Sequence, residues 1–337
     1  MNTEFAARIA AADAFVVVTP EYNARPDHCS EEPPMAIAIA FSAYGGPDVL
    51  HPIRIAPPAV EAGHVRVRVK AAGVNPVDAK LRRGDFAATL PATFPCRLGN
   101  EYAGVVEQVG DDVTEFAAGD EVLGSVTAQG YAEYVVVNAA DVVRKPAAMP
   151  WTVAAGLPAV GQTAYTALRR IGVGPGDTVL VHAAAGGVGT VAVQLARLWG
   201  ATVIGTASER NHRYLRSLGA IPVSYGDGLI ERIRTLAPQG VDAALDAIGG
   251  ESITASLAVV ADRRRIGTLV DVQAVKDHGI LRVGGRSTAD LRELVTLYEQ
   301  GSLQIPIHAT FPLGQAAQAH REVQTGHVRG KIVLTVT

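Results

Sequence analysis

The spacing of hydrophobic and polar residues divides this chain into two kinds of region. From about residue 36 to 150, short apolar runs are separated by Gly, Pro and Asp. Valine alternates strictly with Arg and Lys over 65–70, which is typical of a strand with one buried face. Further strands are predicted at 36–41, 102–109, 121–126 and 131–137. This region is therefore predicted to be a compact, barrel-like β domain.

One short helix is predicted inside this region, directly after residue 75. Asn75 is suited to the N-cap, Pro76 to the first helical position and Asp78 to the third, and Gly84 ends the helix.

Strand and helix patterns alternate from about residue 160 to 286. Apolar runs predict strands at 178–182, 202–206, 243–247, 266–272 and 280–283, with helices at 210–218, 229–236 and 251–260. This alternation is typical of a doubly wound parallel sheet. Ser287 and Asp290 resemble a capping box before a helix at 291–298, and a helix at 315–323 and a strand at 332–336 follow. The predicted fold class is α/β.

Residues 178–206 follow the order of a dinucleotide-binding unit: strand, glycine-rich turn, helix and second strand. The turn contains Ala183, Gly186, Gly187, Val188 and Gly189. Small residues let the backbone approach a pyrophosphate, and the free N–H groups of the next helix attract that anion. The same glycines would also suit a purely structural turn, but the surrounding pattern favours a dinucleotide.

The end of the second strand indicates which dinucleotide is bound. Ala207 stands where an NAD-specific site carries a carboxylate for the ribose. Ser208 and Arg210 follow and are suited to hold a 2′-phosphate, and Tyr225 is expected beside the adenosine. Glu209 argues for NAD, and Ser208 and Arg210 would also suit a helix cap and a solvated helix residue. We interpret the pattern as predicting NADPH.

Composition excludes several other functions. The net charge is −3, without a basic patch for nucleic acid, and the apolar runs fall short of the ~20 residues of a membrane span. Two cysteines, Cys29 and Cys96, provide neither a disulfide framework nor a thiolate metal cage. The apolar run at 14–18 is too short for a signal peptide. We expect a cytoplasmic protein with no nucleic-acid or membrane partner.

Seven short segments together resemble the zinc-independent quinone oxidoreductase branch of the medium-chain dehydrogenase/reductase family. They are residues 41–47, 72–78, 99–104, 130–134, 161–165, 183–189 and 330–334. The resemblance implies a GroES-like catalytic domain at 35–158 and 287–337, a Rossmann NADPH-binding domain at 159–286 inserted in it, and an active site in the cleft. It also implies a homodimer that pairs the Rossmann edge strands near 280–283.

The zinc ligands of related alcohol dehydrogenases are replaced here. Those enzymes place a Cys in the segment that reads 73–75 in this chain, and a His where Asn100 stands. Asn75 and Asn100 are amides, which are poor zinc ligands, so no metal is predicted. The resemblance then implies hydride transfer to an already electrophilic small molecule, a quinone or an α,β-unsaturated carbonyl. A dedicated enoyl-thioester reductase and an NADPH-binding structural or sensor protein with little turnover remain alternatives.

Three residues are candidates for the catalytic site. Asn75 is expected to donate to the acceptor oxygen, or to serve only as the helix cap. Thr163 is expected near the nicotinamide carboxamide, or only at the start of a helix. Tyr131 is expected to place a phenol near the acceptor, or to be an ordinary buried tyrosine.

Two further residues are candidates for cofactor contacts. The backbone of Val270, at the end of the fifth strand, is expected near the nicotinamide, although the neighbouring Asp271 is unusual there. Lys331 either approaches the cofactor or is solvated. His182, on a central strand, is interpreted as a core residue.

Residues 1–34 do not fit either domain. The stretch 11–23 resembles one strand and loop of NADPH-dependent FMN reductases, in which residues 19–23 would contact flavin. Because the rest of that fold is missing, we predict a functionally silent remnant. The alternative is an arm that adds to a neighbouring sheet edge or to the dimer.

Overall fold

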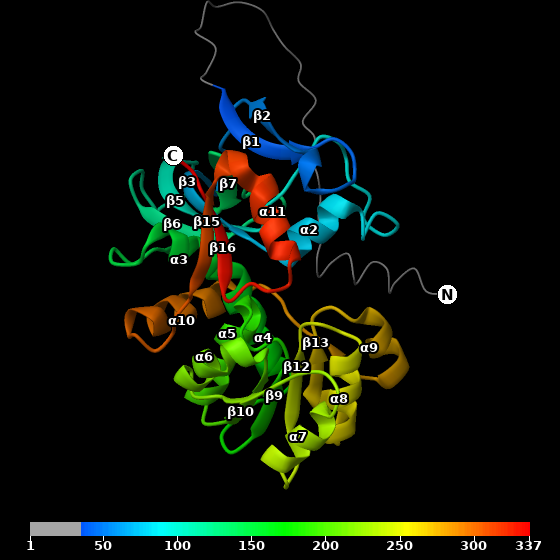
Figure 1. Ribbon diagram of the computed structural model, residues 1–337. Coiled ribbons are helices and arrows are strands. Elements are labelled where there is room, and N and C mark those ends of the chain that lie inside the picture. Colours follow the sequence, from blue (N-terminus) through cyan, green and yellow to red (C-terminus); the bar gives the residue numbers. More distant parts are fainter. Residues whose placement is uncertain (1–34) are drawn as a thin grey trace, which may run out of the picture.

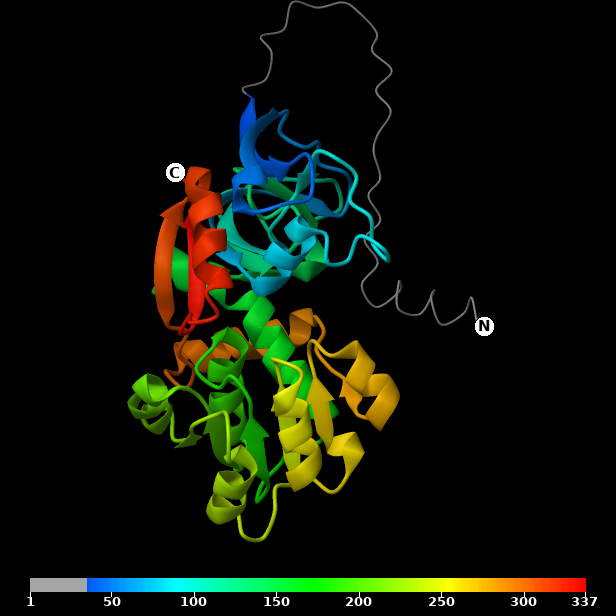
Figure 2. The same cartoon turned by 45° about the vertical axis from the view of Figure 1, so that its right-hand side comes forward.

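The computed structural model describes residues 35–337 and divides them into two lobes (Figure 1). The remnant or arm predicted at 1–34 lies outside the described residues. One lobe is formed by the first part of the chain and its C-terminal tail, and the other by the part between them (Figure 2). This arrangement confirms the predicted α/β class, with a GroES-like and a Rossmann-type lobe.

The first lobe is built on two β-sheets. The larger follows the order β15-β16-β3-β5-β6-β8, with β7 paired to β3, and the smaller follows β2-β1-β4. Val65, Val67 and Val69, the apolar positions of the predicted alternation, are each at most 1% exposed. The strands are β1 (Ala36–Phe41), β2 (Leu50–Ile55), β3 (His64–Val74), β4 (Cys96–Arg97), β5 (Glu101–Val109), β6 (Glu121–Ser125), β7 (Tyr134–Asn138), β8 (Val142–Arg144), β15 (Ile307–Pro312) and β16 (Lys331–Thr335).

The second lobe contains a six-stranded parallel sheet in the order β11-β10-β9-β12-β13-β14. Its strands are β9 (Thr178–Val181), β10 (Thr202–Thr206), β11 (Ile221–Val223), β12 (Ala243–Asp246), β13 (Ile266–Thr268) and β14 (Leu281–Arg282). The order reverses at β9, and in such sheets ligands bind beyond the carboxyl ends of the strands at this switch point. The glycine-rich turn follows β9 directly.

Helices cover the parallel sheet and connect the lobes. They are α2 (Pro76–Arg83), α3 (Trp151–Gly156), α4 (Pro158–Arg170), α5 (Gly187–Leu198), α6 (His212–Ser217), α7 (Leu229–Leu236), α8 (Glu251–Val259), α9 (Val272–His278), α10 (Thr288–Glu299) and α11 (Ala316–Gln324). No helix in residues 35–337 is long and apolar enough to cross a bilayer. The domain boundaries at 158/159 and 286/287 fall at the starts of α4 and α10 and stay predictions.

The strand predicted at 266–272 is too long. The structure ends β13 at Thr268, whose hydroxyl accepts hydrogen bonds from the backbone N–H groups of Val270 and Asp271. The Asp271 carboxylate then caps α9 by accepting from Ala274 N at 2.8 Å. Side-chain caps of this kind compete with strand pairing, so Val270 lies in a turn and not in a strand.

Candidate active site

The glycine-rich turn forms the start of α5, and its glycines are required for different reasons. A Cβ on Gly189 would lie 2.3 Å from the carbonyl oxygen of Ala183, so this glycine lets the helix pack on the turn. A Cβ on Gly187 would lie 2.9 Å from Val160 and 3.2 Å from the Lys331 side chain. A Cβ on Gly186 would meet no atom closer than 3.3 Å. The space beside Gly186 is therefore less crowded than the space beside Gly187 or Gly189.

The first turn of α5 is not capped by a side chain. Gly186, the N-cap residue, has extended backbone geometry, and Gly186, Gly187 and Val188 are half-buried whereas Gly189 is buried. The first N–H groups of a helix have no partner within it, and the helix dipole makes this end attractive to anions. With the glycine cradle, α5 fits the phosphate of a dinucleotide.

Ser208, Arg210 and Tyr225 lie beyond the carboxyl ends of β10 and β11, as predicted from the sequence. Ser208 is half-buried, and Arg210 and Tyr225 are exposed. A guanidinium nitrogen of Arg210 lies 3.5 Å from the carbonyl oxygen of His327, and Arg329 lies over the Tyr214 ring at 5.2 Å. The segment before β16 therefore adds Arg329, which the sequence interpretation missed, to the basic groups here.

The C-terminal segment contacts the glycine-rich turn directly. Gly330 N donates to Ala185 O at 3.1 Å, and Gly330 forms an isolated parallel bridge with Gly186. Gly330 has a φ of 78°, and a Cβ on it would lie 2.2 Å from Pro306 O. From this contact with the glycine-rich turn the chain continues directly into β16, whose first residue is Lys331.

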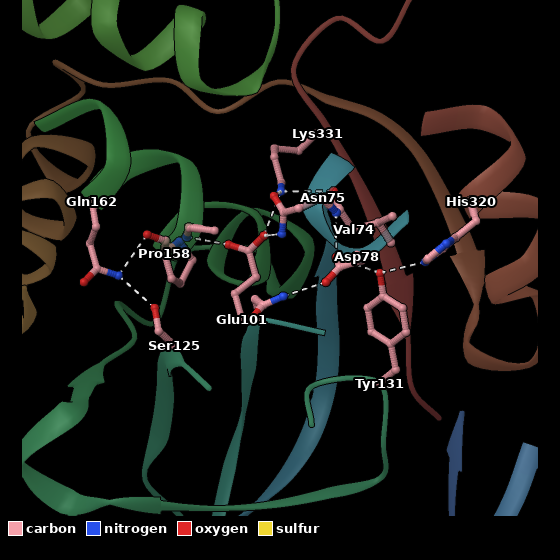
Figure 3. Close-up of polar contacts among 12 residues, drawn as sticks. Val74, Asn75, Asp78, Glu101, Ser125, Tyr131, Pro158, Gln162, His320 and Lys331 are labelled. Carbon is pink, nitrogen blue, oxygen red and sulfur yellow. Dashed lines mark hydrogen bonds and ion pairs between the residues drawn. The ribbon is translucent and has the colours of Figure 1, made fainter. Parts of the chain in front are cut away.

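Lys331, Asn75 and Glu101 form a buried polar cluster between the two lobes (Figure 3). The Lys331 ammonium lies 2.5 Å from Asn75 Oδ1, 2.7 Å from Glu101 Oε1 and 3.2 Å from Val74 O. An ammonium has three N–H donors, so all three are directed at protein acceptors. Lys331 is 3% exposed and is not solvated. Its stem lies against Gly187, while its ammonium is bound to the first lobe.

Asn75 is the N-cap residue of α2, but its side chain does more than cap the helix. The Asp78 carboxylate accepts from the backbone N–H of Asn75 at 2.8 Å, as the predicted cap requires. The Asn75 carboxamide instead reaches Lys331 through Oδ1 and Glu101 through Nδ2, the latter at 2.9 Å. The Asn75 carboxamide is therefore held by two buried partners, Lys331 and Glu101.

Tyr131 joins this cluster from the opposite side, through Asp78. Its hydroxyl donates to Asp78 Oδ2 at 3.0 Å and lies 3.3 Å from His320 Nε2 (Figure 3). Tyr131 and Asp78 are fully buried. Burial raises the pKa of Asp78 to about 6, although hydrogen bonds from Asn75, Tyr131 and Asn100 oppose the shift. Burial also raises the pKa of Tyr131, and lowers that of His320 to about 3.

Thr163 and Val270 lie on the second lobe, apart from this cluster. Thr163 is half-buried within α4, and not at its start as one interpretation required, and its methyl group lies close to Gly284. Val270 is half-buried in the turn after β13. His182 is 1% exposed and hydrogen-bonded to Ser256 at 3.0 Å, as expected of a core histidine.

Asn100, which stands where the related alcohol dehydrogenases place a zinc-binding His, makes hydrogen bonds to two other side chains. Asn100 Nδ2 donates to Asp78 Oδ1 at 2.6 Å, and its Oδ1 accepts from Arg286 at 3.1 Å. Arg286 and Thr127 line a cavity of about 380 Å³ beside this position. In residues 35–337 no three His, Cys, Asp or Glu side chains gather as a metal site would need. Asn75 and Asn100 thus do not form a fitting donor set for zinc.

Two family models match this chain. The alcohol dehydrogenase GroES-like domain matches residues 61–147, and the zinc-binding dehydrogenase domain matches residues 218–334. The chloroplastic NADPH-dependent alkenal/one oxidoreductase of Arabidopsis thaliana is 33% identical over 312 residues, which cover 88% of this chain and 78% of that relative. The solved quinone oxidoreductase of Coxiella burnetii is 33% identical, with a TM-score of 0.82 over 90% of this chain and 100% of that one.

The chain belongs to the quinone oxidoreductase branch of the medium-chain dehydrogenase/reductase family. The family predicted from the seven segments is confirmed. Polyketide synthase GfsB of Streptomyces halstedii is 36% identical over 297 residues, or 82% of this chain, but the chain spans only 5% of that relative. This quinone oxidoreductase fold therefore also resembles one segment of a much larger protein.

Proposed function

We propose that this chain is an NADPH-dependent oxidoreductase that transfers hydride to a quinone or an α,β-unsaturated carbonyl compound. One observation carries the proposal. The C-terminal segment links the glycine-rich turn, where α5 begins without a side-chain cap, to Asn75, a buried hydrogen-bond donor. A site for the cofactor and a group that can act on the acceptor are thus adjacent. The names of the Arabidopsis and Coxiella relatives support the same reaction.

The residues present fit NADPH. The backbone of Ala183, Gly186, Gly187, Val188 and Gly189 would hold the pyrophosphate at the start of α5. The cluster Ser208, Arg210 and Tyr225 would hold the adenosine and its 2′-phosphate, since the exposed Arg210 offers charge and Ala207 offers no carboxylate. Thr163 and Val270 would line the nicotinamide end, and the stem of Lys331 would support the turn.

When bound, this cofactor supplies the hydride. Asn75 would donate a hydrogen bond from Nδ2 to the acceptor oxygen as negative charge develops there, and a fixed donor of this kind stabilises the transition state. Tyr131 would act through Asp78, because its hydroxyl is already directed at Asp78 and His320. We assign the proton that completes the reduction to water. No metal is needed for an acceptor that is already electrophilic.

The likeness to the solved CurK enoyl reductase, which is 28% identical with a TM-score of 0.80 over 90% of this chain and 99% of that one, supports a second candidate function, the reduction of an enoyl thioester on a carrier or on CoA. The acceptor carbonyl would then belong to the thioester, and the roles of Asn75 and the nucleotide turn would be unchanged. The two candidates differ in the size of the group that the cleft must admit.

We further propose that the chain forms a homodimer through the edge of its parallel sheet. The edge strand β14 pairs only with β13 among the described residues, which leaves one side for the homodimer contact expected near 280–283. A cytoplasmic location stays a prediction.

The test is NADPH oxidation by purified protein with 1,4-benzoquinone, with a simple enone and with an enoyl-CoA, followed by product identification. Formation of the quinol or the saturated ketone supports the proposed function, and turnover only with enoyl-CoA supports the second candidate. If the protein binds NADPH but reduces none of the three, the catalytic proposal is wrong and a structural or sensing role gains weight.

A further inference from the structure

Glu101 is a fully buried carboxylate at the start of β5 that contacts three separate parts of the chain. Its Oε1 lies 2.9 Å from Asn75 Nδ2 and 2.7 Å from Lys331 Nζ. Its Oε2 accepts from the backbone N–H of Ala159, in the first turn of α4, at 2.7 Å. One side chain therefore joins the candidate donor, the C-terminal strand and the helix that leads into the cofactor lobe.

The backbone around Glu101 leaves room for its carboxylate and for little else. A Cβ on Gly73 of β3 would lie 2.0 Å from Glu101 Oε1 and 2.6 Å from Ala155 O. Contacts this short do not occur, so any larger residue at position 73 would displace the carboxylate or the start of the helical segment. The absence of a side chain at Gly73 thus leaves the space that the Glu101 carboxylate occupies.

The partners of Asn75 determine which way its carboxamide points. Lys331 can only donate, so it must face Oδ1, and an ionised Glu101 can only accept, so it must face Nδ2. A reversed carboxamide would place donor against donor and acceptor against acceptor. Among residues 35–337, one N–H of Nδ2 is satisfied by Glu101 and the second has no protein acceptor. This second N–H is the group that the proposed function assigns to the acceptor oxygen.

We propose that Glu101 is a positioning residue, which holds the Asn75 carboxamide with its nitrogen toward the acceptor and ties this group to the first turn of α4. The inference rests on the proposed function, because it concerns how Asn75 is aimed. A buried ion pair alone would not require such a group, since well-packed apolar residues often replace buried pairs without loss of stability. The contacts to Asn75 and Ala159 are what an apolar replacement would lose.

The test compares Glu101→Gln with the wild type and with a matched control, Glu121→Gln. Glu121 also pairs with a buried lysine, Lys145 at 2.8 Å, but has no contact with Asn75. The Glu101→Gln change keeps the size of the side chain, but the new carboxamide must present a nitrogen to at least one donor. We expect kcat for benzoquinone or enone reduction to fall about tenfold to a hundredfold, the loss typical of a misplaced reacting group. KM and the NADPH Kd should change less than about threefold, because ground-state binding is retained.

A double-mutant cycle with Asn75→Ala separates positioning from a general structural role. If Glu101 acts through Asn75, Glu101→Gln added to Asn75→Ala should change kcat less than about twofold. Losses that multiply would overturn the proposal, as would wild-type kcat in Glu101→Gln. A wild type that reduces no acceptor would instead overturn the proposed function, so the two failures are distinct.

A further variant covers the case in which Glu101→Gln does not fold because it leaves the Lys331 charge buried and unpaired. Glu101→Gln/Lys331→Met removes both charges and should fold. Its kcat should be reduced at least as much, because Asn75 then loses the Lys331 donor and faces a carboxamide in place of the Glu101 carboxylate. A folded double variant with wild-type kcat would refute the positioning role, and so would a chain that folds only with the ion pair.

Discussion

Arg82 Nε lies 3.3 Å from His320 Nδ1 in the core of the first lobe, and this contact fixes the form of the histidine. Because a guanidinium can only donate, Nδ1 must accept, and the ring proton must be on Nε2. His320 Nε2 then donates to the Tyr131 oxygen, and Tyr131 donates to Asp78. Protonation of His320 would place an N–H at Nδ1, directed at the N–H of Arg82 Nε.

We therefore expect His320 to make the protein acid-sensitive. Its folded-state pKa is lowered to about 3 by burial, from an ordinary value of 6.5. The unfolded chain binds a proton at His320 more readily than the folded protein does. The contribution of His320 to the unfolding free energy is therefore fully present above pH 6.5 and is lost as pH falls toward 3. His320→Gln should flatten the pH dependence of the unfolding free energy between about pH 4 and 6.5. Urea titrations at several pH values measure this, and the exposed His278→Gln should leave the slope unchanged.

The flattening should be partial, because His182 acts in the same direction. Burial lowers the pKa of His182 to about 4 from 6.5, so its contribution is also lost on acidification. A variant His320→Gln whose pH dependence equals that of the wild type would contradict the assigned hydrogen-bond directions.

Asp78 should change the pH dependence of the unfolding free energy in the direction opposite to that of the two histidines. Burial raises its pKa from 3.8 to about 6, so the folded state binds this proton more tightly than the unfolded state. Its contribution is thus lost as pH rises from about 4 to 6. Asp78→Asn should make stability rise more steeply with pH in that window. The variant should also be less stable at neutral pH by about 1–3 kcal/mol, because Asn75 N, Asn100 and Tyr131 are all donors and the new amide nitrogen finds no acceptor. An unfolding free energy equal to that of the wild type at neutral pH would refute this.

Local patterns in the sequence were sufficient to predict most strands and the glycine-rich turn, whereas β2, β4, β8 and β15 were not predicted. Alternating valines, the glycine-rich turn and the caps at Asn75 and Ser287 each depend on neighbours within a few residues, and the Ser287 cap is confirmed by a 3.2 Å bond to Asp290 N. The strand at 266–272 was wrong because a local cap, Asp271, ended the apolar run, and this was a readable signal.

The centre of the site was harder to predict because its contacts are distant in sequence. Glu101 is 26 residues from Asn75 and 230 from Lys331, and Arg82 is 238 from His320. No periodicity links such positions, so Glu101, Asp78 and His320 were not site candidates. The one sequence signal for Glu101 was its place in the resembling segment 99–104. Lys331 was a candidate for a cofactor contact, but its burial was not predicted, since an isolated lysine usually lies at the surface.

Alanine substitutions at two glycines of the turn should affect stability and cofactor binding separately. Gly189→Ala places a Cβ 2.3 Å from Ala183 O and should lower the melting temperature by several degrees, as overpacking costs about 1–3 kcal/mol. Position 186 has extended backbone geometry, and the Cβ of Gly186→Ala would meet only Ala183 O, at 3.3 Å, so this variant should lose much less stability than Gly189→Ala. It should nevertheless weaken NADPH binding about tenfold or more, because its methyl group occupies the space assigned to the pyrophosphate.

Thermal unfolding and NADPH fluorescence titration measure the two effects. Gly174→Ala, with no atom within 4 Å of the added Cβ, is the matched control and should change neither. Normal NADPH affinity in a folded Gly186→Ala variant would argue against this turn as the phosphate site.

Arg210 should determine the preference for NADPH over NADH. Its guanidinium is exposed beyond β10, next to Ala207, and its 3.5 Å contact with His327 O is long enough to be exchanged for a phosphate. Arg210→Ala should raise the KM for NADPH about tenfold, the loss expected of one charge-assisted contact worth roughly 1.5 kcal/mol, and leave the KM for NADH unchanged. The matched control is Arg213→Ala, an exposed arginine on the following helix α6. Equal losses with both cofactors would show that Arg210 acts on the protein and not on the 2′-phosphate, and Glu209 would then need the same test with NADH.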